Sequence, residues 1–271
     1  METEKKYDTS KLSFCLAVLS ISLFLTSYSV INGIIPQMRD ALGVTEAQAE
    51  LLSTTPSLTA LITLILSPWL ARFFGFKKVI GAGLLLVGVT AFVPMFVNSY
   101  GAVMVARVLF GMGLGLYNSL AITQVQLLFS GDRRATMLGI RGATENLGQA
   151  IMTALVSVLF AWAGWHGAFG VYLFALPVLV WFWIKVPDIK IAADGSSNID
   201  DELKDQHFPS KTNPIMFVFC AFAALYMIIF NSVNVRFAAI AQETQGKDYD
   251  SSVIISVGIL FAVAAGFVYG F

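Results

Sequence analysis

Two neighbouring stretches of this chain, residues 51–71 and 79–97, contain no charged side chain. A helix needs about 20 mostly apolar residues to cross the roughly 30 Å hydrocarbon core of a bilayer, and each stretch is close to that length. The short segment between them carries Arg72, Lys77 and Lys78 around Gly75. Because short cytoplasmic loops of membrane proteins retain Lys and Arg, segment 67–78 predicts a tight cytoplasmic hairpin between two membrane-spanning helices.

The composition extends this prediction to the whole chain. Of its 271 residues, 57% are hydrophobic and 13% are charged, whereas a soluble domain carries about 25% charged residues. This indicates an all-α membrane protein with several spans. The formal net charge of zero gives no reason to expect a nucleic-acid partner. Cys15 and Cys220 lie in separate apolar runs, which is typical of buried small side chains rather than of a disulfide or a metal site; no cofactor is expected.

The apolar runs predict eight spans, each of roughly 20 or more residues. The first run is too long for the core of a signal peptide and has no cleavage site after it, so we expect it to be retained. The predicted spans cover residues 12–35, 47–71, 79–97, 102–128, 135–161, 167–186, 214–240 and 251–271.

The basic residues predict the orientation of these spans. With the N-terminus in the cytoplasm, twelve Lys and Arg residues lie on the cytoplasmic side and two, Arg39 and Lys247, on the outer side. Tryptophans are predicted at both interfaces: Trp69, Trp181 and Trp183 inside, and Trp162 and Trp165 outside. The cytoplasmic set comprises Lys5, Lys6, Lys11, Arg72, Lys77, Lys78, Arg133, Arg134, Lys185, Lys190, Lys204 and Lys211.

One polar, acidic segment, residues 187–212, reads as a cytoplasmic linker. It divides the chain into a six-span bundle, 1–186, and the beginning of a second bundle, 213–271. A weak internal sequence similarity pairs Asn32 and Gly43, at the end of span 1, with Asn234 and Gly246, at the end of span 7. Parallel repeats of this kind build one class of transporter, so we expect about four further spans in the complete protein.

The span plan and two local motifs resemble the major facilitator superfamily. The hairpin matches the family's pattern G-x-x-x-D-(R/K)-x-G-(R/K)-(R/K) at Gly75, Lys77 and Lys78, and departs from it at Pro68 and Arg72, where the family has Gly and Asp. In the family, this hairpin takes part in holding the two halves together on the cytoplasmic side. The resemblance implies a twelve-span helical bundle, of which about eight spans are present, that works as a secondary transporter.

Span 4 contains ARVLFGMGLG, similar to the family's R-x-x-x-G-x-G-x-G pattern through Arg107, Gly111, Gly113 and Gly115. In proton-coupled drug exporters of the family that Arg is linked to proton coupling. Span 5 lacks the Gly-Pro motif of those exporters. A nucleotide-binding loop is a poor explanation for the glycines, since they lie inside an apolar span; close helix packing is the predicted role.

Glu145 is the one acidic residue predicted well inside a span. It lies about ten residues into span 5, roughly 15 Å deep, where an ionisable group is costly and therefore a functional candidate. Arg141 precedes it by one helical turn, and Asn146 and Gln149 widen the polar stripe. Two interpretations remain open: a self-satisfied buried pair, or a site that contacts solute or a proton.

Arg107 is predicted roughly 8 Å from the outer surface, so it either serves coupling or extends to the lipid headgroups. Asn118 and Gln124 belong to a polar second half of span 4, part of which should face a wet cavity. Asn32 shares a helix face with Tyr28 and is a candidate cavity residue; a helix-packing hydrogen bond is the alternative.

We therefore expect a secondary active transporter of small solutes in the cell membrane, working by alternating access and coupled to protons, and monomeric when complete. A drug/proton antiporter is the main alternative within the class. A membrane-embedded enzyme is disfavoured because His166 and His207 lie on opposite sides and no metal-ligand spacing is present. A non-transporting membrane sensor is the remaining alternative. The substrate does not follow from the sequence.

Overall fold

The computed structural model describes residues 12–186 and scattered positions between 218 and 244. Every element in the described part is helical. The predicted linker 187–212 and predicted span 251–271 lie outside the described residues, and the described positions within predicted span 214–240 are helical. The elements are α2 (Leu12–Ser20), η1 (Ile21–Phe24), η2 (Ser27–Ser29), η3 (Asn32–Ile34), α3 (Ile35–Leu42), α4 (Glu46–Phe74), α5 (Phe76–Thr90), α6 (Phe92–Phe96), α7 (Tyr100–Leu128), α8 (Gly131–Ala168), η4 (Phe169–Phe174) and α9 (Ala175–Lys185).

Five helical stretches in the described part are long and apolar enough to cross a membrane: Ser13–Leu42, Glu46–Phe74, Phe76–Phe96, Tyr100–Leu128 and Arg133–Lys185. The last has 53 residues, and its backbone leaves the helical region at Ala163 and Gly164, where Gly164 has φ 63°. It therefore comprises two spans, divided within the gap predicted between spans 5 and 6. The six spans predicted for residues 12–186 correspond to these stretches.

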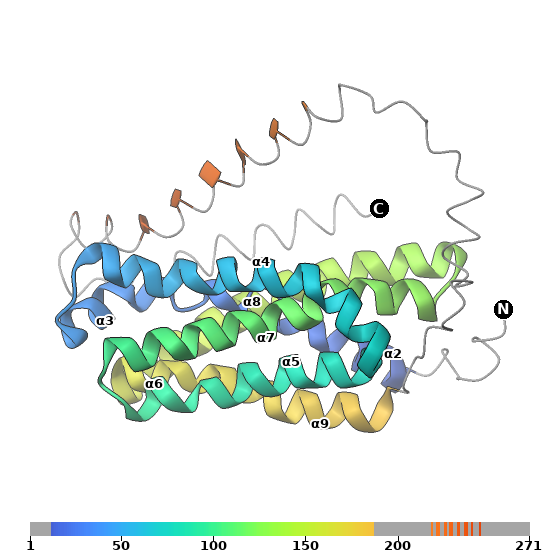
Figure 1. Cartoon of the computed structure of the whole chain (residues 1–271), viewed down its shortest axis with the longest axis horizontal. Coiled ribbons are helices and arrows are strands. Elements are labelled where there is room, and N and C mark those ends of the chain that lie inside the picture. Colours follow the sequence, from blue (N-terminus) through green and yellow to red (C-terminus); the bar gives the residue numbers. More distant parts are fainter. Residues whose placement is uncertain are drawn as a thin grey trace.

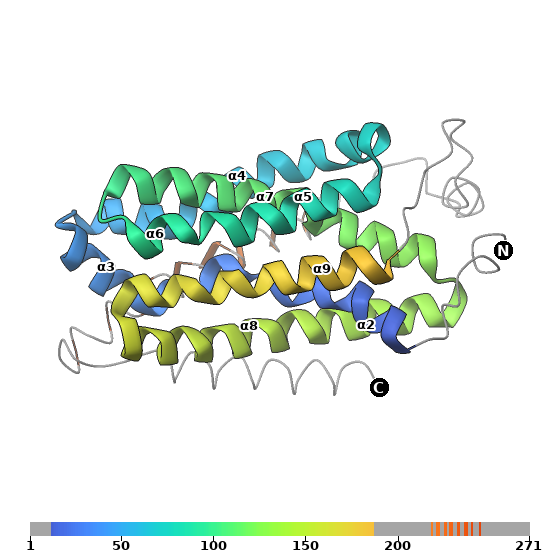
Figure 2. The ribbon, with the colours of Figure 1, turned by 90° about the horizontal axis from the view of Figure 1, so that it is seen from below.

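The spans run antiparallel along the long axis of the bundle (Figure 1). α7 packs against both α4 and α5, α9 lies along α5, and α8 lies along the first span and η4. The α4–α5 turn, the start of α2 and the end of α9 lie at one end of the bundle (Figures 1 and 2). This is the end to which the basic residues assign the cytoplasm.

The hairpin between spans 2 and 3 is shorter than segment 67–78 predicts. α4 continues to Phe74 and α5 begins at Phe76, so Gly75 alone makes the turn, with φ 89° and ψ 150°. This backbone region is open to glycine almost exclusively. Arg72 and Lys78 are exposed on helical turns, because long basic side chains reach polar surroundings without interrupting a helix.

Glycines set the spacing between α7 and its neighbours. A Cβ on Gly111 would collide with Thr59 and the backbone of Pro56 in α4, and one on Gly115 with Thr63 and Ala60. Small residues four positions apart thus let α4 and α7 approach through their backbones. Gly113, on another face of α7, meets the carbonyl oxygen of Gly83 in α5 in the same way.

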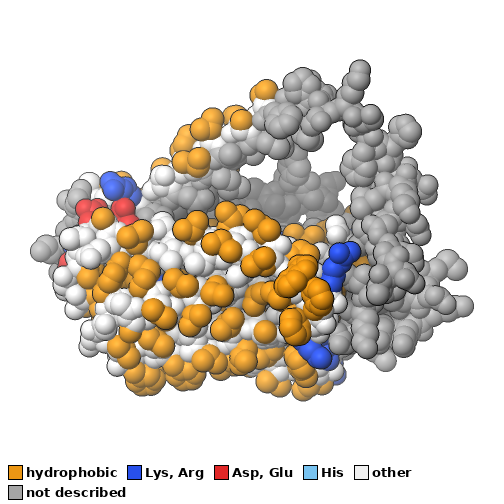
Figure 3. All heavy atoms as spheres, viewed as in Figure 1, with side chains coloured by type: hydrophobic (Ala, Val, Ile, Leu, Met, Phe, Trp, Pro, Cys, Tyr) orange, Lys and Arg blue, Asp and Glu red, His pale blue; other side chains and the backbone are white. Residues whose placement is uncertain are grey.

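The outer surface of the bundle is apolar in its middle and charged toward its ends (Figure 3). Large exposed side chains such as Ile65, Phe73 and Val105 are typical of a surface that faces lipid tails. Of the predicted interfacial tryptophans, Trp165 is an exception: it is only 7% exposed and stacks on the His166 ring, with 3.7 Å between centroids. The kink at Gly164 turns it inward.

Candidate functional site

The first span is irregular over its middle third. Three short 3-10 segments, η1, η2 and η3, replace a continuous α-helix between α2 and α3. Serine hydroxyls contribute, because Ser20, Ser27 and Ser29 each bond the backbone carbonyl three residues earlier, at 2.8, 2.7 and 3.0 Å. Such bonds compete with the regular helical pattern. The predicted uninterrupted helix over 12–35 is therefore wrong in this detail, although the span crosses the bundle.

Side chains from spans 4 and 6 satisfy the carbonyls of this irregular segment. Backbone groups without partners are costly in a membrane unless protein donors replace the missing helical bonds. The donors are two tyrosine hydroxyls and one guanidinium: Tyr117 to the Phe24 carbonyl (3.2 Å), Tyr172 to that of Ser27 (3.0 Å) and Arg107 Nη2 to that of Tyr28 (3.0 Å).

Arg107 points into the bundle and does not extend to the outer surface. Its side chain is 1% exposed, and its Nε donates to the Leu52 carbonyl of α4 at 2.8 Å. It also lies over the Phe110 ring, 5.0 Å from the centroid. The predicted alternative of a headgroup contact is therefore wrong: span 4 is rotated so that this residue faces spans 1 and 2, a rotation that depth alone does not determine.

Arg141 and Glu145 form an ion pair inside a membrane span. Arg141 Nη1 lies 3.4 Å from Glu145 Oε2, and the two side chains are 12% and 25% exposed. The pair is one helical turn apart on α8, as the spacing predicts. Arg141 Nε is buried without a hydrogen-bond partner. The two side chains are therefore held by one long contact and are partly exposed, rather than fully buried in the core.

Polar groups of the first span border this ion pair. Gln149 Nε2, one turn beyond Glu145 along α8, donates to Ser29 Oγ of the first span at 2.9 Å. Spans 1 and 5 therefore share one polar region. No ion pair joins Arg107 with Glu145, whose partner is Arg141.

The remaining candidates occupy other places. Asn32 is 6% exposed and accepts a 2.6 Å hydrogen bond from Ser53 of α4, which is the helix-packing alternative for this residue. Asn146 donates to the Gly142 carbonyl on its own helix. Asn118 is half-buried, while Gln124 is 1% exposed and its Oε1 has no partner.

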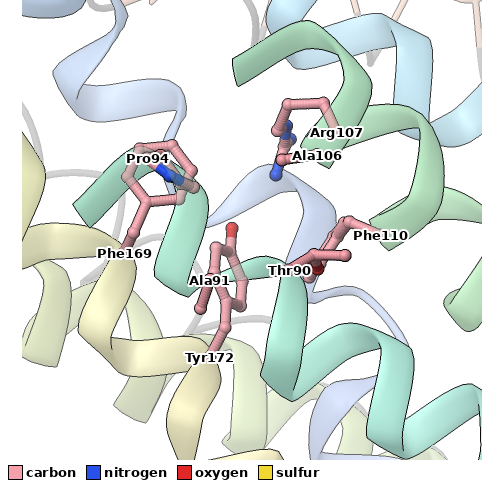
Figure 4. A pocket seen from close by; sticks show the side chains of 8 residues that line it. All are labelled: Thr90, Ala91, Pro94, Ala106, Arg107, Phe110, Phe169 and Tyr172. Carbon is pink, nitrogen blue, oxygen red and sulfur yellow. The ribbon is translucent and has the colours of Figure 1, made fainter. Parts of the chain in front are cut away.

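The sequence analysis did not predict that the Tyr117 and Tyr172 hydroxyls bond backbone carbonyls of the first span. The available signal is that a tyrosine in the middle of a span has a hydroxyl that needs a partner. Tyr172, Arg107 and Phe110 also border a small pocket between spans 3, 4 and 6 (Figure 4). Thr90, Ala91, Pro94, Ala106 and Phe169 complete its wall.

Comparison with known proteins identifies the architecture. The family description of the Major Facilitator Superfamily matches residues 17–271. The chain belongs to the Major Facilitator Superfamily. The predicted family, the all-helical multi-pass membrane architecture and the transport class are thereby confirmed.

Two relatives that are named as transporters each match part of this chain. The bacillibactin exporter of Bacillus subtilis is 28% identical over 161 residues, 57% of this chain and 40% of that protein. The probable sulfoacetate transporter SauU of Cupriavidus necator is 29% identical over 156 residues, 57% of this chain and 36% of that protein. The chain thus spans well under two thirds of either relative.

Solved transporter structures share the fold. The proton:xylose symporter XylE bound to 6-bromo-6-deoxy-D-glucose has a TM-score of 0.60 at 16% identity, over 67% of this chain and 46% of that one. A POT family transporter in complex with 5-aminolevulinic acid has a TM-score of 0.57 at 16% identity, over 82% and 47%. At these identities the likeness shows the fold of the superfamily member and nothing about its solute.

Proposed function

We propose that the complete protein is a secondary active transporter of a small polar solute, driven by protons through Glu145. The observation that carries the proposal is the Arg141–Glu145 pair: an accessible acid at membrane depth, 3.4 Å from an arginine that has an unpartnered Nε. Ionisable residues in such positions commonly mark ion and substrate pathways. Alternating access of two six-span bundles, 1–186 and the one that begins at 213, is the accompanying mechanism.

In this mechanism Glu145 exchanges a proton and Arg141 responds. While Glu145 is ionised, it attracts the Arg141 guanidinium. Protonation removes that attraction, and Arg141 then has donors free for an acceptor group of the solute. Gln149, one turn beyond Glu145 and bonded to Ser29 of the first span, would keep the solute oriented. Asn32, Asn118, Gln124 and Asn146 are proposed to extend this polar region, while Arg107 supports it by holding spans 1 and 2 together.

The test replaces Glu145 with Gln in the complete gene product, reconstituted in liposomes with a pH-sensitive dye inside. Sugars, small organic acids, amino acids and peptides are added in turn, and a transported solute is recognised by the proton flux it causes. We expect Glu145→Gln to abolish this flux while leaving solute counterflow, which needs no net proton movement. Asp40→Asn, at an exposed outer position paired with Arg39, is the matched control and should transport normally.

Normal proton-driven uptake by the Glu145→Gln protein would contradict the role of Glu145. Absence of flux for every solute, in the unmodified protein as well, would favour a non-transporting sensor. The names of the two relatives, an exporter of bacillibactin and a probable transporter of sulfoacetate, differ in solute, so the screen must be broad.

A drug/proton antiporter is the second candidate. The arginine and glycines of span 4 that resemble those of proton-coupled drug exporters favour it, and so does the fact that one relative is named an exporter. Cells expressing the complete protein should then accumulate less of a cationic dye than control cells. Unchanged accumulation argues for the first candidate. Placement in the cell membrane with the N-terminus inside, and a monomeric state, belong to the same proposal.

A further inference from the structure

Arg107 carries a charge that no described residue neutralises. The guanidinium has five N–H groups and stays protonated in proteins. Its hydrogen bonds from Nε and Nη2 both end on neutral backbone carbonyls, and Nη1 is buried without a hydrogen-bond partner among the described residues. The nearest candidates for a counter-charge are engaged elsewhere, since Asp40 pairs with Arg39, Glu145 with Arg141 and Glu50 with Arg236.

The unpartnered nitrogen belongs to a residue that lines a pocket. Figure 4 shows the Arg107 guanidinium and the Tyr172 hydroxyl turned toward the same space, which Phe110 and Phe169 flank. The other hydroxyls in the wall are already in use as donors: Tyr172 bonds the Ser27 carbonyl, and Thr90 bonds the Leu86 carbonyl at 2.8 Å. Arg107 Nη1 is therefore the free donor in this wall.

A water molecule would satisfy the N–H groups of Nη1 but would leave the positive charge in place. A buried charge is strongly unfavourable unless it is paired and hydrogen-bonded. The Phe110 ring face lowers that cost in part, since aromatic faces attract cations. A small anion would accept from Nη1 and also neutralise the guanidinium. The pocket has room for about one small, solvent-sized body, so it excludes an organic ligand and leaves a monatomic ion as the anion of suitable size.

We propose that the pocket between spans 3, 4 and 6 binds one small monovalent anion, of the size of chloride, on Arg107 Nη1. The anion is a resident structural ligand and not the transported solute. By neutralising Arg107 it stabilises the contact through which this residue holds the carbonyls of Tyr28 and Leu52. The proposal does not depend on the proton-coupling role of Glu145, since the anion binds at Arg107 Nη1 and the proton is exchanged at Glu145.

The test measures the thermal stability of the complete protein, purified in chloride-free gluconate buffer, as chloride replaces gluconate at constant ionic strength. A ligand that binds only the folded state raises Tm as its concentration exceeds Kd. We expect a saturable rise of about 2–4 °C with chloride and with bromide, and none with sulfate. An anomalous bromide peak beside Arg107 in a crystal would locate the ion.

Two variants assign the effect to this pocket. Arg107→Gln removes the charge, and Ala106→Leu fills the pocket while it keeps the arginine; both should lose the chloride-dependent rise in Tm. Ala106→Leu is informative even if Arg107→Gln fails to fold. Equal Tm values in chloride and gluconate for the unmodified protein would overturn the proposal and leave a bound water as the partner of Nη1. A full chloride response in Ala106→Leu would also overturn it, by placing the ion elsewhere.

Discussion

Arg107 holds two neighbouring spans through their backbones rather than through another side chain. Its contacts are the Leu52 carbonyl of α4 and the Tyr28 carbonyl of the first span. The sequence predicts the depth of this residue, because depth follows from counting residues along a span. It does not predict the direction of the side chain, because the rotation of a helix depends on packing with the other spans.

Tyr172 offers a clean test of how much each such contact contributes. Replacing Tyr172 with Phe keeps the ring in the core and removes only the 3.0 Å bond to the Ser27 carbonyl. We expect a loss of about 1 kcal/mol in the free energy of unfolding, typical of one neutral hydrogen bond. The measurement is the Tm of the complete protein in detergent, followed by tryptophan fluorescence.

The matched control for Tyr172→Phe is Tyr100→Phe. The Tyr100 hydroxyl bonds the Gln48 carbonyl at 3.3 Å, in a half-buried position near the end of α7. Its loss should lower Tm by less than the loss of the Tyr172 hydroxyl. Equal losses of Tm in the two variants would mean that a side-chain donor to the irregular segment stabilises the protein no more than an ordinary surface hydrogen bond.

At the scale of the element, the sequence predicts where helices cross the membrane. It does not predict where those helices are interrupted. The apolar runs locate spans 2 to 4 within a few residues of α4, α5 with α6, and α7. The first span reads as one helix because its middle is as apolar as its ends. Its serines, and the Asn32-Gly33 pair before Pro36, are signals of irregular backbone that only the packing of spans 4 and 6 brings into effect.

The contact between α4 and α7 depends on Gly111. We expect Gly111→Ala to destabilise the protein by about 1–3 kcal/mol or to prevent its folding, because the new methyl group meets the backbone of Pro56 as well as Thr59. The readout is the yield of monodisperse protein and its Tm. Gly101→Ala is the control on the same helix, since a Cβ there meets nothing within 4 Å.

Gly101→Ala should leave the stability unchanged or raise it by up to about 1 kcal/mol, the gain in helix propensity. If both alanine variants behave alike, close approach of the helices is not what the span 4 glycines provide.

The whole molecule has charged ends and an apolar middle, and its ends differ in charge. The α4–α5 turn carries exposed basic residues, Arg72 and Lys78, whereas acidic side chains such as Asp40 and Glu46 gather at the other end. The bundle of six spans could be predicted from hydropathy and from the basic loops together.

The orientation is testable by labelling single cysteines in intact cells. In a protein with Cys15→Ser and Cys220→Ser, we expect Ser99→Cys to react with a membrane-impermeant maleimide and Lys78→Cys to react only after the cells are opened. Both positions are exposed in turns or at helix ends, so reactivity reports the side of the membrane. The reverse pattern would show that the N-terminus lies outside.

The irregular first span has a consequence for biosynthesis. Its carbonyls are bonded by side chains 79, 93 and 145 positions further along the chain. A ribosome releases those donors only after several later spans have been made. The first helix to enter the membrane therefore waits with unfinished hydrogen bonds until the sixth arrives beside it, so the earliest span is among the last to reach its final form.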